Sequence, residues 1–220
     1  RPIGLGVQGL ANVFFEYGYS FDSDEAKELN DRIFECIYYG SMKSSMLLAK
    51  EREIYMEKYK MWLKQIKDAD VYGDFISSDD YNNIKESLGP IIPEEVDREE
   101  YLGSYSSYIG SPLYKGKLQF DLWDYQMTDI HHDWSVLREE IKKYGVRNSL
   151  LVAPMPTAST AQILGNYECF EPILSNIYTR RVLSGEYMVI NEYLVNDLIT
   201  LGLSSEQPQC YHYFEPISVC

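Results

Sequence analysis

The sequence predicts an α/β fold built on a parallel sheet or barrel. Residues 150–153 (LLVA) form a short apolar run, typical of a strand that is buried on both faces of a parallel sheet. A turn containing Pro154 and Pro156 follows, and an apolar helical pattern then runs to Gly165–Asn166. A strand, a tight turn and a helix in this order are typical of parallel α/β architecture.

Local patterns predict further elements on both sides of this segment. Ser23, followed by two acidic residues, predicts a helix start, and apolar residues at helical spacing continue to Ala49. Cys36 falls on that apolar stripe, so we expect a buried packing residue rather than a reactive thiol. A second helix is predicted over residues 136–145, and residues 118–125 (LQFDLWDY) favour a strand that runs into a loop.

Residues 4–9 (GLGVQG) fit the glycine pattern of dinucleotide-binding folds, but we reject that interpretation. No strand can precede the first glycine, and residues 20–25 predict a loop and a helix cap instead of a second strand that ends in an acid. We expect these glycines to allow close backbone approach at a helix start. The core-facing residues of that helix would be Leu10, Val13, Phe14 and Phe15.

Composition excludes several classes of function. The net charge of −14 opposes binding to a nucleic-acid backbone, and no apolar run approaches the ~20 residues that span a membrane. The four cysteines are widely spaced and form no C-x-x-C pair, which is typical of a reducing, cytoplasmic compartment and gives no metal site. His131, His132 and Asp133 are adjacent in sequence, so they would not converge on one ion. The chain begins without Met or a signal-peptide pattern, as expected of a segment cut from a longer protein or of a processed chain.

The turn before the helix at residues 158–164 carries the most informative chemistry. Thr157, Ala158, Ser159 and Thr160 are all small, and three of them bear a hydroxyl group. The first N–H groups of a helix have no intrahelical acceptor, so small hydroxylated residues at this place can cradle a phosphate. The alternative is that Thr157 or Ser159 merely caps its own helix, and the segment by itself leaves both possibilities open.

Four long strings of this chain resemble the large, catalytic subunit of class I ribonucleotide reductase of the eukaryotic and viral type. They are RPIGLGVQGLANVF at the start, SPLYKGKLQFDLW at 111–123, APMPTASTAQILGN at 153–166 and SNIYTRRVLSGEY at 175–187. The resemblance covers residues 1–50 and 104–202, in the order that the family has. It implies part of a ten-stranded α/β barrel and reduction of ribonucleoside diphosphates to deoxyribonucleotides. It also implies a diphosphate-binding site at Pro156, Thr157, Ala158, Ser159 and Thr160.

The resemblance also implies partners that this chain does not contain. The family needs a small subunit with a metal-generated radical, thioredoxin or glutaredoxin as dithiol reductant, and ATP or dNTP effectors; no cofactor would bind this chain directly. The N-x-C-x-E segment, which holds the family's radical cysteine and base, is absent, and residues 166–169 have the wrong order. We therefore assign no catalytic residue. Asn12 stands where the family has an acid, which puts any role of that side chain in doubt.

The resemblance divides the chain into four segments. Residues 1–50 and 104–202 would be barrel segments, 51–103 an insertion with a charged helix and an acidic Tyr-rich loop, and 203–220 a divergent tail. The insertion is either a surface excursion or a docking surface, whose candidate contacts are Tyr55, Tyr59, Met61 and Trp62. Cys210 and Cys220 are ten residues apart, too far to match the family's closely spaced terminal pair.

Two hypotheses of function remain from the sequence. One is a portion of a working reductase that is completed by a complementary large-subunit segment. The other is a non-catalytic remnant that acts as a binding or assembly piece.

Overall fold

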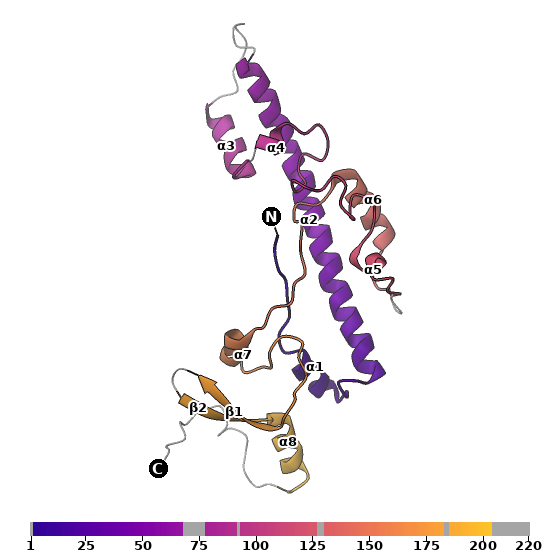
Figure 1. Cartoon of the computed structure of the whole chain (residues 1–220), viewed down its shortest axis with the longest axis vertical. Helices are drawn as coiled ribbons and strands as arrows, with labels where there is room; N and C mark the ends of the chain where they lie inside the picture. The colour runs from indigo at the N-terminus through magenta and orange to yellow at the C-terminus, as the bar shows by residue number, and fades with distance from the viewer. Residues whose placement is uncertain (1, 68–77, 92, 127–129, 183–184, 204–220) are drawn as a thin grey trace. The chain divides into compact units, whose positions relative to one another are not determined.

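The computed structural model describes residues 2–67, 78–91, 93–126, 130–182 and 185–203 (Figure 1). The chain divides into two compact units, each described by itself below. The helical unit comprises Arg1–Leu5 and Glu28–Ala153, and the hairpin unit comprises Gly6–Lys27 and Pro154–Cys220. The predicted tail over 203–220 lies, apart from residue 203, outside the described residues, as do Cys210 and Cys220.

Helices dominate the described residues. The helical unit contains most of α2 (Asp24–Lys67) and all of α3 (Ser78–Leu88), α4 (Pro93–Val96), α5 (Gln119–Leu122) and α6 (Trp134–Tyr144). The hairpin unit contains α1 (Leu10–Tyr17), α7 (Ala158–Leu164), β1 (Ile177–Val182), β2 (Gly185–Ile190) and α8 (Glu192–Thr200). In the described part of the chain, no helix is both long and apolar enough to cross a membrane.

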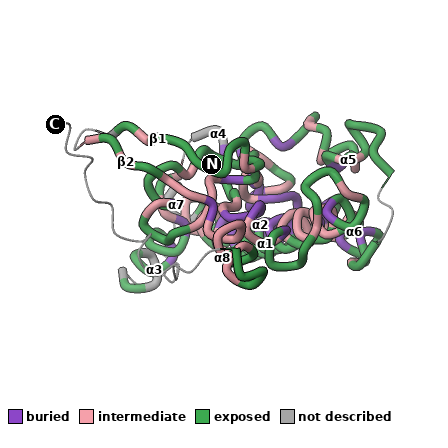
Figure 2. Tube along the Cα trace, turned by 90° about the horizontal axis from the view of Figure 1, so that it is seen from below, coloured by how far each residue is buried: buried purple, intermediate pink, exposed green. Residues whose placement is uncertain are grey.

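Helix α2 begins where its capping signal predicts. The Ser23 hydroxyl accepts a hydrogen bond from the backbone N–H of Ala26 at 3.2 Å. The prediction that Cys36 is buried is wrong, because its side chain is exposed. The buried positions of α2 include instead Glu35, Met42 and Met46, which recur at helical spacing. Figure 2 shows buried stretches along α2 beside exposed ones.

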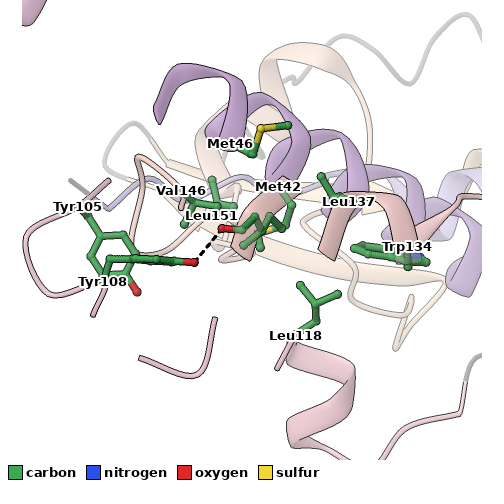
Figure 3. Close-up of a cluster of buried hydrophobic side chains, with 10 residues drawn as sticks. Met42, Met46, Tyr105, Tyr108, Leu118, Trp134, Leu137, Val146 and Leu151 are labelled. Carbon is green, nitrogen blue, oxygen red and sulfur yellow. Dashed lines mark hydrogen bonds between the residues drawn. The ribbon is translucent and has the colours of Figure 1, made fainter. Parts of the chain in front are cut away.

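The main core of the helical unit lies between α2 and α6. Met42 and Met46 of α2 pack in one cluster with Leu137 and Ile141 of α6. Its other buried members, all labelled in Figure 3, are Tyr105, Tyr108, Leu118, Trp134, Val146 and Leu151. The buried Tyr108 hydroxyl donates to the Ile141 carbonyl at 2.9 Å, and burial raises the pKa of Tyr108 well above its ordinary value. The helix predicted over 136–145 is confirmed and corresponds to α6.

The strand predicted over residues 118–125 is wrong, because this segment forms the short helix α5. The Leu118 N–H donates to the Asp121 carboxylate at 2.7 Å, which closes a helical turn. Arg138 of α6 donates two hydrogen bonds to the same carboxylate, at 2.6 and 2.8 Å. This ion pair joins residues 17 positions apart, so the alternation pattern gave no sign of it.

Residues 78–91 and 93–103 fold against the second half of α2, as Figure 1 shows for α3 and α4. The predicted boundary between residues 50 and 51 falls inside α2. We call the second core the satellite cluster; its buried members are Met56, Ile84, Leu88 and Leu102. Tyr55 and Tyr59 pack against this cluster, whereas Met61 is exposed. That residues 51–103 are an insertion, and what the insertion does, remain predictions.

The apolar run at 150–153 is extended and pairs in parallel with the start of the chain. Ile3 N–H donates to the Leu150 carbonyl at 3.0 Å, and Leu5 N–H donates to the Leu151 carbonyl at 2.8 Å. The Ala153 N–H returns a bond of 2.8 Å to the Leu5 carbonyl, and Leu5 and Val152 form a parallel bridge. Leu151 is buried but Leu150 is exposed, so in the described residues only one face of this run is covered.

The glycine segment behaves as a helix start. The extended residues 3–5 include Gly4, so among the described residues no strand precedes the first glycine of the motif. Residues 20–25 form turns and the start of α2 instead of a second strand. Gly9 caps α1 with φ of 78°, a conformation that favours glycine. Leu10 and Phe14 are buried as predicted, whereas Phe15 is 40% exposed and stacks on Tyr193.

Candidate functional site

The turn at residues 156–160 is open to solvent within the described residues. We call it the diphosphate loop after the ligand that the family resemblance implies. Pro156, Ala158, Ser159 and Thr160 are exposed, and Thr157 is half-buried. The first intrahelical bond of α7 runs from Ala161 N–H to the Thr157 carbonyl at 2.8 Å. The N–H groups of residues 158–160 precede that bond, so helix geometry leaves them without intrahelical acceptors.

The three hydroxyl groups of this loop have different surroundings. Thr157 is the N-cap residue of α7 but makes no side-chain capping bond; its Oγ1 accepts from the Cys169 N–H at 2.8 Å. The Thr160 hydroxyl lies 2.9 Å from Gln8 Oε1 and 3.2 Å from the Thr157 carbonyl, both acceptors. The Ser159 hydroxyl has no hydrogen-bond partner in the described part of the chain. Self-capping by Thr157 is therefore not the arrangement observed.

Residues 166–169, which we call the clasp turn, are hydrogen-bonded to the loop through Cys169. Gly9 N–H donates to the Tyr167 carbonyl at 2.8 Å, and Leu10 N–H donates to the Cys169 carbonyl at 3.4 Å. The Asn12 side chain accepts from Tyr167 N–H at 2.7 Å and donates to the Tyr193 hydroxyl at 3.0 Å. Sequence reasoning missed this network, and its one signal was the unexpected amide at position 12.

Tyrosines and paired charges surround the clasp turn. Burial raises the pKa of Tyr167 to about 12, with contributions from Tyr178 and Glu192. Burial also raises the pKa of Tyr193, so both phenols are protonated at neutral pH. Arg180 is paired with Glu168.

An open groove of about 610 Å³ lies beside the loop in the hairpin unit. Its lining begins at Ala161, directly after the diphosphate loop, and includes no residue of 156–160. Residues 165–168 and 171–175 line one part of it, and β1 and β2 contribute Tyr178, Arg180 and Met188. The diphosphate loop is therefore a surface feature at the edge of this groove.

The other sequence candidates hold the fold together. The backbone N–H groups of His131 and His132 lie 3.2 and 3.3 Å from the Glu35 carboxylate, and the His132 ring stacks on Tyr39. Asp133 caps α6 by accepting from Ser135 N–H at 3.0 Å. Within the described ranges no group of three or more His, Cys, Asp or Glu residues is placed to hold a metal ion.

These features define a class of protein: an α/β chain in which a parallel-paired run is followed by an exposed, hydroxylated turn at the start of a helix. Comparison with known proteins makes the class specific. Residues 1–212 match the family model described as ribonucleotide reductase, barrel domain. The chain belongs to this family, which confirms the predicted fold class and the resemblance to the large subunit.

Curated relatives agree with the family model. The chain is 46% identical over 203 residues to the ribonucleoside-diphosphate reductase large subunit of Arabidopsis thaliana, covering 92% of this chain and 19% of the relative. It is 44% identical over 206 residues to the ribonucleoside-diphosphate reductase large chain of Neurospora crassa, covering 94% and 17%. For the large subunit of Acanthamoeba polyphaga mimivirus the identity is 39% over 218 residues, covering 98% and 19%. The chain thus spans about a fifth of the length of the curated relatives it matches.

Proposed function

We propose that this chain supplies the substrate diphosphate-binding loop of a ribonucleoside-diphosphate reductase large subunit. The whole protein would reduce ribonucleotides to deoxyribonucleotides. The observation that carries the proposal is the exposed loop at 156–160. Its N–H groups at 158–160 precede the first intrahelical bond of α7, and its Ser159 hydroxyl has no partner among the described residues. It lies in a chain that corresponds to a region of the large subunit in its relatives.

The loop would bind the diphosphate mainly through its backbone. The N–H groups of Ala158, Ser159 and Thr160 donate to phosphate oxygens, and the Ser159 hydroxyl adds a fourth donor. Ala158 has too small a side chain to keep a phosphate from the backbone, and Pro156 fixes one backbone angle at the entrance of the loop. The net charge of −14 does not prevent this, because the donors act on oxygens in direct contact.

The remaining chemistry would come from outside this chain. Its sequence contains no N-x-C-x-E segment, so the radical cysteine and the base would belong to a complementary large-subunit segment. A small subunit would supply the radical, thioredoxin or glutaredoxin the electrons, and ATP or dNTP the allosteric control. We therefore expect the 220-residue chain to bind a ribonucleoside diphosphate without turning it over.

The test is an NMR titration of the ¹⁵N-labelled chain with ADP and, in parallel, with adenosine. The proposal predicts that ADP shifts the amide signals of residues 158–160 and that adenosine leaves them in place. Equal effects of ADP and adenosine, or no shift with either, would refute the assignment of the diphosphate to this loop.

A further inference from the structure

We propose that Asn12 is a positioning residue for the diphosphate loop. Its side-chain amide holds the clasp turn at 166–169, and that turn in turn holds Thr157 at the start of the loop. This inference rests on the proposed function, since it assigns to Asn12 the shape of the site that binds the diphosphate. Nothing in the chemistry of Asn12 requires it to touch the substrate.

Both ends of the Asn12 amide are used. Oδ1 accepts from the Tyr167 N–H at 2.7 Å, and Nδ2 donates to the Tyr193 hydroxyl at 3.0 Å. The Tyr167 N–H can only donate, so it fixes which end of the amide faces it. One side chain on α1 therefore connects the clasp turn with α8, across sequence separations of 155 and 181 residues.

The clasp turn depends on such external bonds. Cys169 is buried and has φ of 46°, a left-handed conformation that a non-glycine residue adopts only when its surroundings impose it. Gly9 N–H and Leu10 N–H bind the carbonyls of Tyr167 and Cys169, and Asn12 binds the Tyr167 N–H between them. These three bonds hold the residues on both sides of Glu168, and they thereby place the N–H group of Cys169.

The Cys169 N–H transmits this position to the loop. It donates to Thr157 Oγ1 at 2.8 Å. The hydroxyl of Thr157, which is the N-cap residue of α7, therefore points toward the clasp turn. A loop held this way needs little reordering when an anion binds, which improves apparent affinity without any new contact. Loss of the Asn12 bonds would let the loop occupy other conformations, and apparent affinity falls with the fraction that remains competent.

The far end of the network is rigid. The Tyr193 ring stacks on Phe15 with a centroid distance of 4.8 Å and an interplanar angle of 8°. An aspartate at position 12 would keep an acceptor for the Tyr167 N–H, which is the bond that holds the clasp turn. The Tyr193 hydroxyl, which also interacts with Glu16, would lose only the Nδ2 donor. An alanine would lose both bonds. The network therefore predicts that Asn12→Asp preserves the site and that Asn12→Ala does not.

The experiment measures binding of inorganic pyrophosphate to the 220-residue chain, followed by the amide signals of residues 158–160. We expect Asn12→Ala to weaken binding about tenfold, the equivalent of about 1.4 kcal/mol for a lost hydrogen bond. Asn12→Asp should bind within about twofold of the parent chain, because the carboxylate replaces the lost acceptor. Val13→Ala is the matched control, since Val13 is half-buried on the same helix and has no polar side chain, and its binding should be unchanged.

The outcomes separate this inference from the proposed function. If the parent chain binds no pyrophosphate, the proposed function fails and the inference fails with it. If the parent chain binds and Asn12→Ala binds equally well, the inference is overturned while the proposed function stands. If Asn12→Ala does not fold, Tyr193→Phe replaces it, because it removes one hydrogen bond and keeps the stacked ring; unchanged pyrophosphate binding by that variant would also overturn the inference.

Discussion

At the scale of single residues, the three hydroxyl groups of the diphosphate loop differ in their hydrogen-bond partners. Thr157 accepts from Cys169, Thr160 contacts Gln8, and the Ser159 hydroxyl has no partner within the described ranges. Gln8 and Thr160 are 152 positions apart in the chain. Only Ser159 can therefore turn its hydroxyl to a ligand without breaking an existing bond.

Ser159→Asp tests this division directly. The new carboxylate would repel a phosphate at the same place, so we expect ADP binding to the chain to weaken by about 1–3 kcal/mol. Isothermal titration calorimetry measures the change. Ser107→Asp, at an exposed position of the helical unit, is the control for added charge and should leave binding unchanged. Equal affinity of Ser159→Asp and the parent chain would show that the diphosphate binds elsewhere.

At the scale of elements, one buried carboxylate attaches the segment before α6 to α2. Glu35 of α2 is 6% exposed and accepts from the backbone N–H groups of His131 and His132. It also accepts from the indole N–H of Trp134 at 3.0 Å. A buried carboxylate is stable only when donors such as these compensate for its lost hydration.

Glu35→Ala should therefore destabilise the helical unit by about 3 kcal/mol, because it leaves buried donors without an acceptor. Urea denaturation followed by Trp fluorescence measures the loss. Glu51→Ala, an exposed position on the same helix, is the matched control and should change stability by less than about 0.5 kcal/mol. Similar stability of both variants would contradict the role given to Glu35.

A second buried carboxylate connects α4 with α2 and with the segment after α6. Glu95 pairs with Arg52 at 2.9 Å and with Arg147 at 3.3 Å. Burial alone would raise the pKa of Glu95, but the two guanidinium groups together outweigh burial and hold it below its ordinary value. A lowered pKa means that this stabilisation is present above about pH 4.3, the value for an unfolded chain, and is lost as pH falls further.

Glu95→Gln should accordingly cost about 3 kcal/mol at pH 7, because it removes the charge that pairs with buried Arg52 and half-buried Arg147. The difference between variant and parent should shrink when the urea titration is repeated near pH 3.5. Glu57→Gln, at an exposed position of α2, serves as the control. A difference that stays constant between the two pH values would rule out the ion pair as its source.

At the scale of the whole molecule, local sequence patterns predicted several helix boundaries. Contacts between residues far apart in the chain account for the features that the sequence analysis missed. The start of α2 and the end of α7 follow from caps and helical periodicity, whereas α6 starts at Trp134, two residues before the predicted start. The error at residues 118–125 and the missed Asn12 network both involve partners far along the chain, Arg138 in one case and Tyr193 in the other. No local pattern encodes such partners. The proposed diphosphate site was predicted from the small hydroxylated residues at a helix start together with the resemblance to a family.

The satellite cluster bears on whether residues 51–103 can be removed. All its buried members lie within that segment, whereas the main core around Met42 and Leu137 uses none of them. We expect a chain that joins residue 50 to 104 to unfold cooperatively, with reduced stability because Arg147 loses Glu95. Thermal unfolding followed by near-UV circular dichroism measures this. For comparison, Met42→Ala in the main core should lower the free energy of unfolding by about 2–5 kcal/mol, the usual range for such a cavity. Non-cooperative unfolding of the deleted chain would contradict the division into two cores.

The central claim is that residues 156–160 hold the diphosphate of the substrate, and a crystal structure of the chain with bound ADP tests it most directly. The account predicts phosphate oxygens within hydrogen-bonding distance of the N–H groups of residues 158–160 and of the Ser159 hydroxyl. A diphosphate bound instead at Arg180 in the 610 Å³ groove, with the loop empty, would contradict it.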